Sequence, residues 1–186
     1  MEIVEVGHPA LRERAREVAG DEIAAPAFQA FVDDLIAAKR AAGGAGLAAN
    51  QVADLRRVAI CEVEPDHPRY PYKPPLPLTV MINPVLERVG DETITVNEGC
   101  LSVPDLRGEV ERFARVRVSY LDREGHAREQ EFRGLSAGTA QHEVDHLDGV
   151  LFLDRVADPR TLTTWANFDA EGFAERARAI TQRHGS

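Results

Sequence analysis

The chain has 186 residues, with 22 lysines and arginines against 31 aspartates and glutamates, which gives a net charge of −9. This length and the 44% of hydrophobic residues are ordinary for one globular unit, so we expect residues 1–186 to form a single domain. The acidic balance disfavours a DNA-binding protein, which needs a basic face. The sequence also lacks a membrane-spanning apolar run, a secretory signal and the cysteines of a disulfide scaffold. We therefore expect a cytoplasmic protein with neither DNA nor a membrane as partner.

The first predicted element is an amphipathic helix over residues 26–42. Its apolar residues recur at helical spacing, Pro26 stands in its first turn, and a glycine pair follows its end. A strand is predicted over residues 57–63. Six prolines then fall within residues 64–78. Because proline excludes a helix or a central strand, this segment is predicted to be a stiff surface loop.

Short strands and two further helices are predicted after the loop. The strands are expected at residues 79–83, 85–89, 93–96, 116–120 and 128–132, and the helices at 135–147 and 170–181. Pro84 separates the first two of these strands. Because the strands follow one another while the helices lie towards the two ends, the order predicts an α+β fold with a mainly antiparallel sheet.

The strongest chemical signal is the H-E-x-x-H pattern from His142 to His146, inside the predicted helix 135–147. Residues four apart project from one face of a helix, so the two imidazoles can reach one metal ion. Glu143 lies close enough to transfer a proton to or from water at that metal. The alternative without chemistry is a helix with two histidines on its exposed face.

The third metal ligand decides the class of protein, because a catalytic site of this kind usually has three protein ligands. One metalloprotease group has a histidine where this chain has Phe152, so that group is excluded. Another group uses a downstream glutamate, and Glu171 or Glu175 could serve in a zinc endopeptidase. The competitor is Cys100, since a thiolate is a strong ligand for Zn²⁺ or Fe²⁺. A cysteine in a strand is otherwise a small buried hydrophobe, which is how we interpret Cys61.

Three motifs together resemble the peptide deformylase family. Residues 44–51 resemble its G-x-G-x-A-A-x-Q motif, residues 98–102 match E-G-C-L-S, and residues 141–146 match Q-H-E-x-D-H. The resemblance extends from about Gly7 to Phe152. It implies partly open, mainly antiparallel β-sheets around a central metal-binding helix, with an N-terminal and a C-terminal helix beside them. It also implies removal of the formyl group from the N-terminal formylmethionine of newly synthesised polypeptides, which releases formate.

The resemblance implies a role for each residue of the metal site. Cys100, His142 and His146 would ligate one divalent metal per chain, with water in the fourth position. Fe²⁺ is the expected native ion, and Zn²⁺, Ni²⁺ or Co²⁺ are accepted in the family. Glu143 would be the general base that later protonates the leaving amine.

The family's remaining site positions lie around the substrate. Gln51 and the backbone N–H of Leu101 would hold the developing oxyanion, where preorganised donors are typically worth about 10²–10³ in rate. The positions expected to bind substrate are Gly46, Val96, Glu98, Arg107, Leu135, Gly138 and Thr139. The small Gly138 and Thr139 predict a roomy pocket for the methionine side chain. Arg107 would steady the metal-site strand or the substrate backbone, or else form a salt bridge to Glu98 or another carboxylate.

The chain departs from the shortest family members outside these motifs. The loop over residues 64–78 is longer and resembles a subset that includes organellar-type enzymes. Residues 171–186 contain three arginines against two glutamates, which permits contact with ribosomal RNA near the exit tunnel. Besides the deformylase and the zinc endopeptidase, a metal-stabilised binding module without turnover fits the same motifs.

Overall fold

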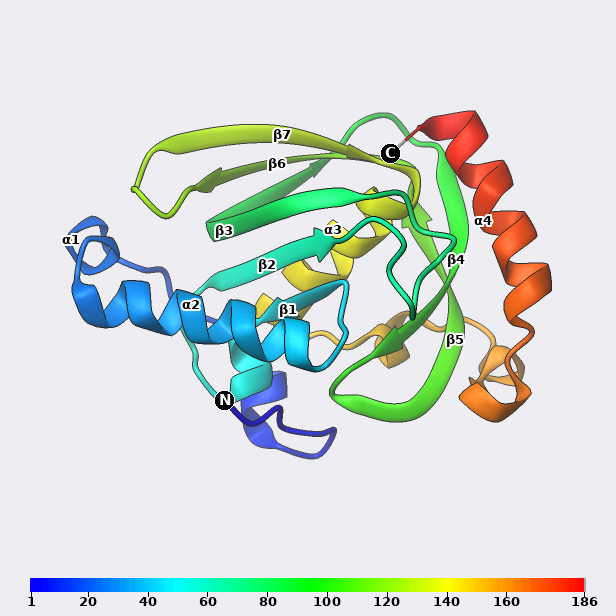
Figure 1. Ribbon diagram of the computed structural model, residues 1–186, viewed down its shortest axis with the longest axis horizontal. Helices are drawn as coiled ribbons and strands as arrows, with labels where there is room; N and C mark the ends of the chain where they lie inside the picture. Colours follow the sequence, from blue (N-terminus) through cyan, green and yellow to red (C-terminus); the bar gives the residue numbers. More distant parts are fainter. Residues whose placement is uncertain (186) are drawn as a thin grey trace.

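The computed structural model describes residues 1–185, which form two antiparallel sheets around one helix (Figure 1). One sheet has the strand order β1-β2-β3-β6-β7, and the other has the order β4-β5-β8. The strands are β1 (Gly46–Ala48), β2 (Val58–Val63), β3 (Leu76–Arg88), β4 (Thr93–Cys100), β5 (Val103–Phe113), β6 (Arg115–Leu121), β7 (Ala127–Arg133) and β8 (Thr163–Thr164). Neighbouring strands of both sheets are antiparallel, which confirms the predicted α+β class.

The predicted helices are confirmed with small changes at their ends. The α-helices are α1 (Gly20–Ile23), α2 (Pro26–Ala41), α3 (Gly134–Leu147) and α4 (Ala170–His184), and the short 3₁₀ helices are Pro9–Arg12, Ala49–Val52, Phe152–Arg155, Pro159–Thr161 and Trp165–Asn167. Helix α2 packs its apolar face, including Phe28 and Leu35, on Leu47, Ile60 and neighbouring residues of the larger sheet. Among the helices of residues 1–185, none combines the length and hydropathy needed to cross a membrane.

Helix α3 lies between the two sheets and is buried over most of its surface (Figure 1). Its first two turns consist largely of small residues, so the strands can approach its backbone closely. A helix that is buried on all sides must place even its polar residues in the interior. The H-E-x-x-H pattern therefore lies inside the molecule rather than on an exposed face.

The predicted break at Pro84 is wrong, because β3 is one continuous strand from Leu76 to Arg88. Its pairing with β6 shifts register between Ile82 and Val85, and Asn83 there has a φ of 52°. A bulge is one of the few places where a sheet accepts proline, because a bulge leaves a backbone N–H unpaired. Because β3 begins at Leu76, the proline-rich loop predicted over residues 64–78 ends at residue 75.

The sequence pattern did not predict strand β5, because charged residues interrupt its alternation of apolar and polar positions. It pairs with β4 over nearly its whole length, and Arg107 and Arg112 are buried on it. Helix α4 packs beside this sheet and α3 (Figure 1), with Phe173 and Ala177 against Val96 and Leu135.

Candidate metal centre and active site

Strand β4 turns three site residues towards α3. Val96, Glu98 and Cys100 are buried at alternate positions, as the two-residue period of a strand requires. The register with β5 shifts between Gly99 and Cys100, just before the turn into β5. Such a bulge redirects the side chain beside it, and here that side chain is the Cys100 thiol.

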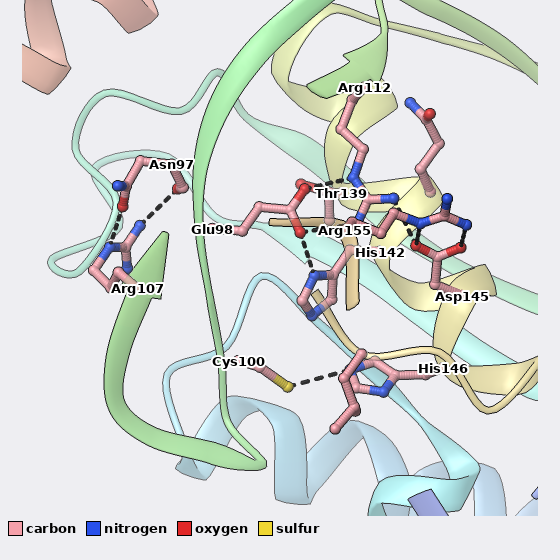
Figure 2. A network of polar contacts seen from close by, with 12 residues as sticks. Asn97, Glu98, Cys100, Arg107, Arg112, Thr139, His142, Asp145, His146 and Arg155 are labelled. Atoms are coloured by element: carbon pink, nitrogen blue, oxygen red, sulfur yellow. Dashed lines mark hydrogen bonds and ion pairs between the residues drawn. The ribbon is translucent and has the colours of Figure 1, made fainter. Parts of the chain in front are cut away.

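The Cys100 sulfur and the rings of His142 and His146 lie together. One ligand atom from each of the three side chains lies within 4.8 Å of the other two. Cys100 Sγ is 3.2 Å from His146 Nε2 (Figure 2). Burial lowers the pKa of His146 well below its usual value and keeps the ring in its neutral, metal-binding form. Two imidazoles and one thiolate at this spacing suit Zn²⁺ or Fe²⁺.

The other candidate ligands lie elsewhere. Glu171 and Glu175 are exposed on α4 and do not belong to the ligand group of Cys100, so the endopeptidase arrangement is wrong. Cys61 packs in the core among residues such as Ala59 and Met81, as expected. Burial raises the pKa of the Cys61 thiol well above its usual value.

A buried network orients the first histidine. Glu98 accepts a hydrogen bond from His142 Nδ1 at 2.8 Å and pairs with Arg112 at 2.7 Å (Figure 2). Arg112 also bonds Asp145 Oδ2 at 2.6 Å, and Arg155 pairs with the same carboxylate. Although burial opposes it, the Arg112 charge holds the pKa of Glu98 far below its usual range. With Nδ1 engaged, the Nε2 atom of His142 is left for the metal.

Sequence reasoning missed Arg112, although its position carried a signal. Arg112 shares a β5 face with the buried Val110, and an arginine at an inward position needs a buried carboxylate. Asn50 was also missed; its side-chain amide donates to the His146 carbonyl oxygen and ties α3 to the segment after β1.

Glu143 is buried beside β1, with 4% of its surface exposed. Burial raises its pKa to about 7. Its Oε2 atom has no hydrogen-bond partner within residues 1–185. Gly46 makes room for this carboxylate, since a Cβ there would lie 2.3 Å from Glu143 Oε1. A carboxyl group with a pKa near 7 can both accept and return a proton at neutral pH.

Gln51 contacts the metal ligand Cys100 through its side-chain amide. Its Nε2 donates to Cys100 Sγ at 3.4 Å and to Ser102 Oγ at 3.1 Å, and its Oε1 accepts from the Ala48 N–H at 2.9 Å. Both ends of the amide are therefore fixed, and the donor end lies at the sulfur. Leu101 follows Cys100 in the turn between β4 and β5.

A pocket of about 70 Å³ lies beside the metal ligands. The predicted site residues that line it are Gly46, Gln51, Val96, Glu98, Cys100, Leu101, Arg107, Leu135, Gly138, Thr139, His142 and Glu143. His146 is fully buried and is not part of the lining.

Gly138 and Thr139 both line this pocket, and the roomy site expected for the methionine side chain stays a prediction. Three residues missed by sequence reasoning also line the pocket: Tyr70 and Lys73 from the proline-rich loop, and Phe173 from α4. The loop and α4 thus contribute side chains to the same pocket as Gly138 and Thr139.

Arg107 forms hydrogen bonds with strand β4 and, in the part of the chain that the structure describes, does not pair with a carboxylate. Its Nε and Nη2 donate to the Asn97 side-chain and backbone oxygens at 2.7 and 2.9 Å. In Figure 2 this pair lies on the opposite side of β4 from the Glu98 carboxylate. The guanidinium carbon is 4.2 Å from the Trp165 ring centre and 4.6 Å from that of Phe168. Within residues 1–185 the arginine that pairs with Glu98 is Arg112, so the alternative Arg107–Glu98 salt bridge does not form.

An α+β fold with two histidines, one cysteine and a neighbouring buried carboxylate is typical of a metallohydrolase. A sequence model of the family described as polypeptide deformylase matches residues 1–161. The chain belongs to this family, which confirms the prediction made from its three motifs.

Relatives match the chain over most of its length. Peptide deformylase 2 of a Nostoc species is 44% identical over 154 residues, which are 83% of this chain and 84% of the relative. A solved class I type b peptide deformylase from Acinetobacter baumannii, bound to Met-Ala-Ser, is 38% identical, with a TM-score of 0.80 over 84% of this chain and 98% of the other. A peptide deformylase from Synechococcus elongatus in complex with actinonin is 30% identical, with a TM-score of 0.74, and covers 98% of this chain and 84% of its own.

Proposed function

We propose that this peptide deformylase removes the formyl group from the N-terminal formylmethionine of newly synthesised polypeptides and releases formate. The observation that carries the proposal is the buried group of Cys100, His142 and His146 with Glu143 beside it. Membership of the deformylase family, reported above, supports the choice of a linear formamide as the bond that is cleaved.

We propose that Cys100, His142 and His146 hold one divalent metal, with Fe²⁺ as the native ion and Zn²⁺, Ni²⁺ or Co²⁺ as functional substitutes. The donor set supports this, since thiolate and imidazole ligands suit these ions. A metal bound there supplies Lewis-acid activation of water and of the formyl carbonyl. Glu98 and Arg112 fix the ring of His142 for this role.

Residues of the chain transfer the protons of the reaction and stabilise the negative charge that it develops. Glu143 takes a proton from the attacking water and passes it to the leaving amine, for which its pKa of about 7 is suited. The Gln51 amide and the Leu101 backbone N–H stabilise the negative charge that develops on the formyl oxygen. Burial of Glu143 keeps bulk water away during the transfer.

The remaining pocket residues bind the methionyl end of the substrate. Val96, Leu135, Gly138 and Thr139 form the walls for the first side chain, and Gly46 borders the formyl group. Glu98 acts on the substrate indirectly, through His142. Arg107 keeps Asn97, and with it β4, in position at the pocket.

We also propose that the enzyme acts in the cytoplasm, close to the ribosomal exit tunnel. Helix α4 supports this with exposed Arg176, Arg178 and Arg183. Cosedimentation with ribosomes tests it, and a variant with all three arginines changed to glutamine should sediment less. Equal sedimentation of both proteins would contradict docking through α4.

Formate release and metal content measured on the same variants test the catalytic assignment. With anaerobically purified protein and formyl-Met-Ala, Glu143→Gln should lose about 10²–10⁴-fold in rate, the typical contribution of a general base, while keeping its metal. Cys100→Ala should lose both metal and activity. Cys61→Ala is the matched control and should keep both. Full activity of Glu143→Gln would remove this residue from the mechanism.

A further inference from the structure

The active-site pocket contains a lysine that the deformylase motifs do not include. Lys73 is one of only two lysines in the chain and comes from the proline-rich loop, far in sequence from the motifs. Its Nζ is 2.8 Å from Thr139 Oγ1 on α3 and 5.2 Å from the centre of the Tyr70 ring. The ammonium group therefore reaches across the pocket from the loop to the helix.

The bond to Thr139 leaves most of the ammonium's donors free. The Thr139 hydroxyl donates to the Leu135 carbonyl at 3.1 Å, so its oxygen accepts from Lys73. An ammonium group has three N–H donors. Within residues 1–185, Lys73 Nζ has no second hydrogen bond and no ion pair. Burial of the side chain lowers its pKa to about 8. Two donors thus remain in a pocket whose other walls include Val96, Leu135 and Phe173.

The position of Thr139 on α3 shows how far the Lys73 ammonium lies from the metal ligands. Thr139 precedes the ligand His142 by three residues, which is nearly one helical turn on the same face of α3. The ammonium consequently lies about one turn away from the metal site, at the wall that Gly138 and Thr139 form. The function proposed above assigns this wall to the substrate's first side chain, which would place the ammonium beside that side chain.

Building on the function proposed above, we propose that Lys73 is a specificity-determining residue that donates a hydrogen bond to an acceptor at the end of the substrate's first side chain. The methionine sulfur is such an acceptor, though a weak one. Norleucine has nearly the same shape and no acceptor, so its binding leaves buried N–H groups without a partner. A site with buried donors discriminates against an analogue that lacks the acceptor. A sulfoxide oxygen, as a stronger acceptor, should be well tolerated.

The test compares three formyl dipeptides in wild type and Lys73→Met, an unbranched replacement of similar length. The wild type should prefer formyl-Met-Ala to formyl-norleucyl-Ala in kcat/KM by about fivefold, the scale of the net contribution of one hydrogen bond. In Lys73→Met this ratio should fall towards one, and the relative rate of the formyl-methionine-sulfoxide peptide should drop. Arg69→Met removes a cation from the same loop at a residue that is not part of the pocket lining, and it should leave all the ratios unchanged.

A binding measurement separates this inference from the deformylase activity. Calorimetric titration of metal-loaded protein with Met-Ala-Ser and norleucyl-Ala-Ser should show the same preference in wild type and its loss in Lys73→Met. If no peptide releases formate, the proposed activity fails, while the titration still tests Lys73. Should Lys73→Met not fold, Thr139→Val removes the acceptor that fixes the ammonium and should lower the ratios in the same direction. Unchanged ratios in a folded variant would overturn the proposal.

Discussion

At the scale of single residues, the site depends on the absence of one side chain. A Cβ at residue 46 would lie 2.3–2.6 Å from three side-chain atoms of Glu143. Because a carboxylate on a flexible chain can move away, Gly46→Ala should fold normally but displace the general base. We expect kcat/KM for formyl-Met-Ala to fall about 100-fold, since displacements of about 1 Å have effects of this size.

The matched control for this prediction is Gly20→Ala, since a Cβ at residue 20 meets nothing within 4 Å. Its activity and melting temperature should stay near those of wild type. If Gly46→Ala kept full activity, the observed position of Glu143 would not be needed for catalysis.

Glu98 tunes the metal site without belonging to the ligand set. Glu98→Gln removes the charge that holds His142 Nδ1, while Arg112 keeps its bond to Asp145. Loss of such a partner typically weakens metal binding about 10–100-fold, and we expect that range here. Competition with a chelator measures the metal affinity directly. Glu109→Gln, on the neighbouring strand and half-buried, is the control; an equal loss in both variants would refute the role of Glu98.

At the scale of elements, α4 and the proline-rich loop close the pocket together. The Phe173 ring of α4 packs edge-on against Tyr72 of the loop, with ring centres 4.9 Å apart, and is 3% exposed. Phe173→Ala should reduce the free energy of unfolding by about 3 kcal/mol, the lower end of the usual range for such a deletion.

The same variant should raise KM for formyl-Met-Ala more than it lowers kcat, because the metal ligands lie on other elements. Urea denaturation and steady-state kinetics measure the two effects. Arg178→Ala, at an exposed position of the same helix, should change neither. A change in kcat alone would show that α4 acts on the chemistry rather than on the pocket.

At the scale of the whole molecule, a buried ion pair fixes α2 to the larger sheet. Lys39 Nζ lies 2.7 Å from Glu62 Oε2 on β2, and Arg40 binds the other oxygen of that carboxylate. A hydrogen bond from Arg40, which has the largest effect, and one from Lys39 lower the pKa of Glu62 to about 2. Glu62→Gln would leave Lys39 buried without its counter-charge, so we expect a loss of about 3 kcal/mol at pH 7.

The pH dependence of this loss has a definite sign. Because folding lowers the pKa of Glu62, its contribution is complete above the ordinary carboxyl value of 4.5 and disappears as the pH falls towards 2. The difference in unfolding free energy between wild type and Glu62→Gln should therefore shrink below pH 4.5. Urea titrations between pH 7 and 3.5 test this. Glu129→Gln, in an exposed pair with Arg117, should cost less than about 1 kcal/mol at every pH.

Local periodicity explains what could be predicted along the chain. The spacing of His142 and His146 required one helical face, and the apolar pattern of residues 26–42 gave α2 almost to its ends. Strand β5 was not predicted because its inward arginines pair with groups on other elements, and a single sequence does not show such partners. Pro84 was taken as a break because nothing in its neighbourhood reveals the register shift that accommodates it.

By itself, the sequence determined the α+β class, the deformylase family and the residues that could bind a metal, because helix and strand periods and short motifs are local properties. Only the tertiary structure decided that the Cys100 sulfur lies 3.2 Å from a His146 ring nitrogen, and that Arg112 fixes Glu98 behind His142. It alone also placed Lys73 and Phe173 in the pocket. Contacts between residues far apart in the chain depend on how sheets, loop and helices pack, which no short segment encodes.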